Sequence, residues 1–169
     1  MLGRTHLIFG LLLGLFFINF FNLGNVFILF VLLGSLFPDL DHPGSLISRF
    51  NFVFKDVSKI ISKTIGHRTY LHTLEAGFLF SLLLAPVFSY FGFNVLFSTL
   101  GFFVGFIGHL FLDSLTRSGI PLFFNGVKWN LFKFKQKKHY GLKLIKTGSI
   151  EEGYLDLILF LLLIGLYLF

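Results

Sequence analysis

An uncharged stretch of 34 residues, from Thr5 to Pro38, constrains this chain more than any other feature. It contains no Asp, Glu, Lys or Arg, and most of its side chains are Leu, Phe, Ile or Val. One soluble core cannot bury so long an apolar run, whereas a lipid bilayer can. A single helix of this length would measure about 51 Å, against a hydrocarbon core of about 30 Å. The stretch is therefore predicted to form two helices joined by a turn.

Asn and Gly in NFFNLGN, residues 19–25, mark that turn. The start of the chain resembles a signal peptide, but no small-residue cleavage site follows, so we expect the first helix to be retained. The chain of 169 residues fits a single domain. We expect an all-α membrane bundle of about five transmembrane or membrane-embedded helices, at residues 5–21, 25–38, 70–90 with an interruption at Pro86, 93–115 and 152–169.

Residues 44–66 follow a different pattern, typical of an amphipathic helix. Apolar side chains recur at steps of three and four, and Arg49, Asp56, Lys59 and Lys63 fall mostly between them. One interpretation is an interfacial helix that lies on the membrane. The alternative is a helix whose apolar side packs on the protein's own core. The apolar positions are Leu46, Ile47, Phe50, Val53, Phe54, Val57, Ile60 and Ile61.

The basic residues predict the orientation of the bundle. The net charge is +6, and residues 117–146 hold eight Lys and Arg without any acid. The basic segments 43–70 and 116–150 alternate with uncharged links, so the positive-inside rule places them and the N-terminus in the cytoplasm of a multi-pass cell-membrane protein. A solvated loop that contacts anionic lipid headgroups explains this charge better than a nucleic-acid partner does.

Imidazoles and carboxylates gather at one end of the predicted helices. His109 and Asp113 are four residues apart, on one helical face. Glu75 lies one turn inside the predicted third helix, while His139, Glu151 and Glu152 receive no role. If the break near residues 19–25 is real, all the candidates meet at the cytoplasmic side. The candidate ligands are His6, Asp39, Asp41, His42, His67, His72, His109 and Asp113.

These residue types predict a divalent metal site. The chain has no Cys, so a metal must be held by His, Asp, Glu or backbone oxygen, a ligand set that suits zinc, with manganese or magnesium as alternatives. Burying an unpaired carboxylate near lipid, such as that of Asp113, would cost roughly several kcal/mol of free energy. Taken singly, His6 is more typical of a membrane interface, and Asp39 of a turn; the metal site is predicted from the whole group.

Four segments together resemble a known family. They are GSLFPDLDHPGSLISR, GHRTYLH, GHLFLDSLTRSGIPLFF and KTGSIEE, and the chain resembles the YdjM-like family of inner-membrane proteins, classed as metal-dependent hydrolases. The sequence departs from the family pattern at Tyr70 and Leu71, where Gly and Thr are usual. Some members are described as binding the LexA repressor. The resemblance is fainter to zinc-dependent phospholipases C. It places functional residues at His6, Asp39, Asp41, His42, His67, Arg68, His72, His109, Asp113, Thr116 and Gly119.

The leading hypothesis is a metal-dependent phosphoesterase that acts on a lipid or prenyl phosphate at the cytoplasmic leaflet. Two or three ions would activate water and neutralise phosphate charge. Asp39, Asp41 and Asp113 would serve the reaction as well as the metal. Arg68 would clamp a phosphate oxygen, or would simply face the lipid headgroups.

Two other hypotheses stay open. A metal transporter or sensor would need polar residues across the bilayer, and the sequence offers none deeper than Glu75. A membrane scaffold would use the basic loop, residues 133–139, to bind a soluble partner or nucleic acid. A membrane peptidase is disfavoured because the chain lacks HExxH.

Overall fold

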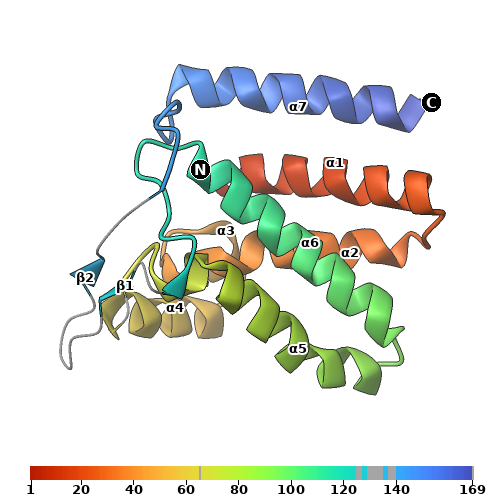
Figure 1. Cartoon of the computed structure of the whole chain (residues 1–169), viewed down its shortest axis with the longest axis horizontal. Coiled ribbons are helices and arrows are strands. Elements are labelled where there is room, and N and C mark those ends of the chain that lie inside the picture. Colours follow the sequence, from red (N-terminus) through yellow and green to blue (C-terminus); the bar gives the residue numbers. More distant parts are fainter. Residues whose placement is uncertain (65, 125–126, 129–134, 137–139, 169) are drawn as a thin grey trace.

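Five long helices dominate the computed structural model, which describes residues 1–64, 66–124, 127–128, 135–136 and 140–168 (Figure 1). Shorter elements connect them: the 3-10 turns η1 (Phe37–Asp41) and η2 (Tyr70–His72), the helices α3 (Leu46–Arg49) and α4 (Phe52–Thr64), and the two-residue strands β1 (Val127–Lys128) and β2 (Lys135–Gln136), which pair antiparallel. The long helices are α1 (Gly3–Phe21), α2 (Val26–Leu36), α5 (Leu74–Tyr90), α6 (Val95–Ser114) and α7 (Ile150–Leu168).

The long helices run back and forth, so their polar ends meet at one side. Contacts join α7 to α1, α1 to α2, α2 to α6 and α6 to α5, and α6 crosses α1 and α2 obliquely (Figure 1). The start of α1, the end of α2, the start of α5, the end of α6 and the start of α7 therefore lie at the same end of the bundle. This end also carries η1, η2 and α4.

Two glycines allow α2 and α6 to touch backbone to backbone. A Cβ on Gly34 would lie 1.9 Å from the carbonyl oxygen of Phe102, and one on Gly105 would lie 1.9 Å from that of Val31. Helices in lipid gain little from burying apolar area against each other, so close packing through small residues holds them together. Beside this contact, Phe30, Phe102 and Phe106 are almost fully buried.

The helical class is confirmed, and the predicted turn near residue 22 is present, where Asn22 adopts a left-handed conformation with φ 52°. The predicted number of about five membrane spans is not confirmed. Within the described residues, only α1 and α6 have the length and apolar composition to cross a membrane, and α5 is apolar but shorter. α2 has 11 residues, about 17 Å at 1.5 Å per residue, because Pro38 ends the α-helix in η1.

The predicted helix at 44–66 is broken into α3 and α4. Asn51 lies between them, and its side chain accepts a hydrogen bond from the Phe54 amide (3.0 Å), so it caps α4. The N-terminal residues of the predicted third helix likewise form η2, and α5 begins only after Thr73, whose hydroxyl accepts from the Ala76 amide. Local side-chain caps therefore set both boundaries.

Glu152 fastens α7 to the start of α1. Its side chain is fully buried, and its two oxygens accept hydrogen bonds from the Leu2 amide (2.6 Å), the Thr5 hydroxyl (2.9 Å) and the Gly148 amide (2.6 Å). The amides of Leu2 and Gly148 lie beside the first turns of α1 and α7, where backbone donors lack helical partners. One carboxylate thus serves the beginnings of two helices and holds the turn that carries His6.

Replacing Gly105 with alanine is expected to destabilise the bundle by about 1–3 kcal/mol, because the new methyl group would collide with the backbone of α2. Gly165→Ala is the matched control, since nothing lies within 4 Å of a Cβ at that position in α7. Thermal unfolding in detergent measures both. Equal melting temperatures for the two variants would contradict the contact.

Glu152→Ala is expected to lower the unfolding temperature far more than Glu151→Ala, although the two residues are neighbours in α7. The first variant leaves three donors near the protein interior without an acceptor, at about 1–3 kcal/mol each, whereas Glu151 is exposed. The same unfolding assay compares them. Similar losses would show that Glu152 does not tie the helices together.

Candidate metal centre

The turn η1 directs two carboxylates inward. Pro38 stands near its start, and the tighter 3-10 winding follows directly on α2. Asp39 is 7% exposed and Asp41 is fully buried. Side chains two positions apart on an α-helix do not face the same way. In η1 the two carboxylates reach different imidazoles: Asp39 lies near His109, and Asp41 lies near His67 and His72.

Asp41 is the acceptor for the loop that precedes η2. Its Oδ1 lies 2.6 Å from Nδ1 of His67, its Oδ2 lies 3.2 Å from Nδ1 of His72, and the Arg68 amide donates to Oδ2 at 2.9 Å. Arg68 reaches this position with φ 57°, in the left-handed region. Non-glycine residues rarely adopt that conformation, and such strain is often found at functional sites.

His109 on α6 is oriented by the backbone of α2. Its Nδ1 donates to the Ser35 carbonyl at 2.7 Å, which leaves Nε2 free to face the cluster. This Nε2 lies 3.4 Å from Nε2 of His72, 3.8 Å from Oδ1 of Asp39 and 3.9 Å from Oδ2 of Asp113. A backbone carbonyl that fixes the tautomer of a His is typical of metal ligands.

His6 and Asp113 complete the buried group. The ring of His6 stacks on that of His109 with centroids 3.7 Å apart, and its Nε2 lies 3.5 Å from Oδ1 of Asp113. Both side chains are about 1% exposed. The amino group of Met1 also contacts Oδ1 of Asp113. α1 and α6 therefore supply this side of the cluster.

Arg68 and Thr116 support Asp113 from the other side. Nη2 of Arg68 lies 2.9 Å from Oδ2 of Asp113, and Nη1 donates to the Thr116 hydroxyl at 3.1 Å. That hydroxyl donates to the Asp113 carbonyl at 2.7 Å, and Gly119 turns the chain with φ 62°. The predicted phosphate clamp is thus held by a carboxylate and a hydroxyl of the site itself.

The donor set fits a divalent cation. Among the described residues, three groups bring nitrogen and oxygen ligand atoms within 4.8 Å of one another: His6, Asp39 and His109; Asp41, His67 and His72; and His72, His109 and Asp113. Both ring nitrogens of His6 are buried without a hydrogen bond. Buried polar atoms normally have a partner, and a bound cation would supply it. Imidazole and carboxylate ligands suit zinc and manganese.

Electrostatics couple Asp41 and His72. Burial alone would raise the pKa of Asp41, but the charge of His72 and hydrogen bonds from His67 and His72 hold it well below its usual value. Burial alone would lower the pKa of His72, yet Asp41 and the neighbouring carboxylates raise it. Asp41 and the neighbouring carboxylates thus favour the charged form of the His72 imidazole. The same carboxylates would favour a metal cation at this position, which binds the deprotonated imidazole.

Three other candidates lie outside these groups. His42 is exposed at the rim, where its Nδ1 accepts from the Gly44 amide at 3.1 Å. Glu75 accepts from the Phe124 amide at 3.2 Å and so anchors the segment after α6. His139 lies outside the described residues, as do Lys133, Lys137 and Lys138 of the basic loop.

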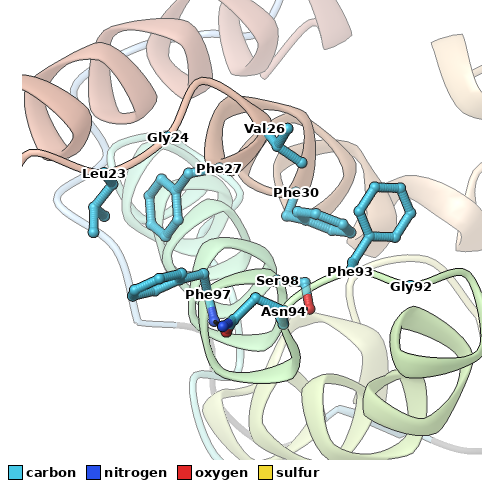
Figure 2. A pocket seen from close by; sticks show the side chains of 10 residues that line it. All are labelled: Leu23, Gly24, Val26, Phe27, Phe30, Gly92, Phe93, Asn94, Phe97 and Ser98. Atoms are coloured by element: carbon cyan, nitrogen blue, oxygen red, sulfur yellow. Dashed lines mark hydrogen bonds between the residues drawn. The ribbon is translucent and has the colours of Figure 1, made fainter.

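A cavity of about 530 Å³ opens beside the cluster. Its wall combines Asp39, His42, His67 and Arg68 with the first residues of α1 and with Ser118. A second cavity, of about 270 Å³, lies at the opposite ends of α2 and α6. Figure 2 shows the rings of Phe27, Phe30, Phe93 and Phe97 around it. The lining of this second cavity contains no His or acid, so of these two cavities the first adjoins the candidate ligands.

Sequence reasoning missed several residues that shape the site. The Ser35 carbonyl and the Met1 amino group belong to the backbone, so no side-chain motif marks them. The sequence assigns no role to Glu152, because its partners, the Leu2 amide, the Thr5 hydroxyl and the Gly148 amide, form no side-chain motif.

Proteins of three bacteria resemble this chain over part of its length. A relative in Bacillus subtilis (strain 168), the uncharacterized protein YvsG, is 34% identical over 122 residues, which cover 70% of this chain and 64% of YvsG. The inner membrane protein YdjM of Escherichia coli (strain K12) is 35% identical over 94 residues, covering 54% of this chain and 45% of YdjM, and that of Shigella flexneri matches equally. The chain thus spans about half to two thirds of the length of these relatives. No solved structure matches.

The family description "YdjM inner membrane protein" matches residues 1–169. The bundle of apolar helices agrees with a protein of the membrane. The resemblance found in the sequence motifs is thereby confirmed, and the chain belongs to the YdjM inner membrane protein family.

Proposed function

We propose that this protein is a membrane-embedded, metal-dependent hydrolase, and specifically a phosphoesterase that acts on a lipid or prenyl phosphate at the cytoplasmic leaflet. The observation that supports this most strongly is the overlap of three His/Asp groups beside a cavity of about 530 Å³. His72 and His109 each belong to two of the groups, so the ligand atoms form one continuous cluster. Such a cluster has the composition of a site for two or more divalent ions.

The residues divide into two sets of ligands. Asp41, His67 and His72 would hold one ion, and His6, Asp39, His109 and Asp113 would hold another. When bound, divalent ions would provide activation of water and neutralisation of phosphate charge. His42, at the rim of the cavity, would meet the substrate rather than the ions.

Arg68 would bind and orient the phosphate group. It lines the cavity, and Asp113 and Thr116 hold its guanidinium in place before any substrate arrives. A group that is fixed in advance need not be reorganised during the reaction, and this is how charged side chains contribute most to catalysis. A guanidinium also matches the geometry of phosphate oxygens.

The placement in the membrane is part of the proposal. The long helices would form a multi-pass bundle in the cell membrane, with the N-terminus and the basic segments in the cytoplasm. In this orientation the cluster, at the common end of the five helices, would lie near the lipid headgroups. A lipid phosphoester could then enter the cavity without leaving the bilayer.

His67→Ala and Asp41→Ala are expected to lower the amount of zinc bound by the purified protein, because each removes a ligand from one group. Asp56→Ala, an exposed acid on α4, is the control. Element-resolved analysis measures the metal content. Zinc should also raise the unfolding temperature of the unaltered protein. At a free zinc concentration one hundred times the dissociation constant, binding adds about 2.7 kcal/mol to the free energy of unfolding. Equal zinc in all variants would contradict the site.

Purified protein with Zn²⁺ or Mn²⁺ is expected to hydrolyse a phospholipid or a prenyl phosphate, and Asp39→Ala is expected to reduce the rate at least about a hundredfold, by loss of a ligand or catalytic carboxylate. Release of phosphate or headgroup in detergent–lipid micelles measures the rate, with Asp56→Ala again as control. Bound metal without turnover of any phosphoester would overturn the proposed reaction. Metal uptake into liposomes would favour a transporter instead.

A further inference from the structure

The helix α4 has three distinct faces, and its apolar face is not the buried one. Ser58 is fully buried and is the side through which α4 contacts the rest of the protein. Val53, Val57 and Ile60, at helical spacings of four and three, are 51%, 40% and 62% exposed. Packing on the protein's own core, the alternative expected for an amphipathic helix, is therefore wrong for this part of the apolar face.

A basic face lies on the other side of α4. Lys55, Lys59 and Lys63 recur every four residues, so they share one face of the helix. One acid of α4, Asp56, lies beside this row, and its carboxylate lies 2.9 Å from Nζ of Lys59. An exposed apolar strip beside such a row of lysines is typical of helices that rest on anionic membranes, where long basic side chains reach the headgroups.

The partner must satisfy both faces together. The chain belongs to a family of inner membrane proteins, and α4 lies at the end of the bundle where the long helices terminate (Figure 1). Just before it, Phe50 is 83% exposed, and Phe52 in its first turn is 78% exposed. A leaflet that contains anionic lipid offers acyl chains to the apolar strip and phosphate groups to the lysines. A soluble acidic protein would match the lysines but leave the apolar residues in water.

We propose that α4 binds the anionic lipid surface on the side of the bundle that carries the His/Asp cluster. α4 packs against η1, the turn that bears Asp39 and Asp41. The lipid-bound helix therefore joins the membrane surface to the wall of the cavity. This interaction stands independently of the proposed hydrolase activity, because it rests on the faces and position of α4 and on the family, and on no residue of the His/Asp cluster.

The absence of Cys from the chain permits single-site labelling. Nitroxide labels would be placed at Val53→Cys and Ile60→Cys on the apolar face and at Lys55→Cys and Lys63→Cys on the basic face. Leu83→Cys, 67% exposed on α5, provides a bilayer reference. The protein would be reconstituted in vesicles with or without phosphatidylglycerol, and accessibility to oxygen and to a water-soluble nickel chelate would be compared.

With phosphatidylglycerol, the apolar-face labels are expected to favour oxygen, as the reference does, and the basic-face labels to favour the nickel chelate. Replacing the three lysines together with Gln should reduce the ratio of bound to released α4 roughly fivefold per lysine removed. The contrast should also weaken in vesicles of phosphatidylcholine alone. Equal nickel accessibility on both faces would overturn the proposal. So would strong spin–spin coupling between apolar-face labels, because a second copy of the chain would then cover this face.

Discussion

The close contact between α2 and α6 is the constraint on which the rest of the structure depends. Gly34 and Gly105 let the two backbones touch, and the residue after Gly34 is Ser35. The carbonyl of Ser35 accepts a hydrogen bond from Nδ1 of His109, so helix packing decides which nitrogen of that imidazole faces the cluster. Asp39 follows four residues later. A bulkier residue at the crossing would displace the ligands as well as the helices.

Stability alone does not account for a buried cluster of charged groups. Asp41 and Asp113 are almost fully buried, and each is surrounded by imidazole, guanidinium or amino groups. Removing a charged side chain from water costs roughly several kcal/mol. Apolar residues of the same volume often give the folded protein equal stability. Apolar residues are abundant in this chain, where 55% of residues are hydrophobic, yet they do not occupy these positions. Retaining carboxylates here therefore favours a role in binding or chemistry.

The sequence indicated the bundle and the common end of the candidate ligands, because apolar length and turn residues report directly on membrane helices. It could not reveal that residues 37–41 wind as the 3-10 turn η1, or which imidazoles Asp39 and Asp41 would each reach. Periodicity also found the apolar side of residues 44–66 but could not say that Ser58 is the packed side. The sequence pattern shows which face of a helix is apolar, whereas the face that packs depends on neighbours that are distant in sequence.

The two ends of the bundle differ in a way that bears on mechanism. At one end, the His/Asp groups from η1, η2, α1 and α6 lie beside a cavity whose wall includes Asp39, His42 and His67. At the other end, the cavity between the starts of α2 and α6 is walled by Phe27, Phe30, Phe93 and Phe97. A route for ions needs polar groups at successive depths, since charge in hydrocarbon is costly. Ligands confined to one end instead suit a reaction carried out at one membrane surface.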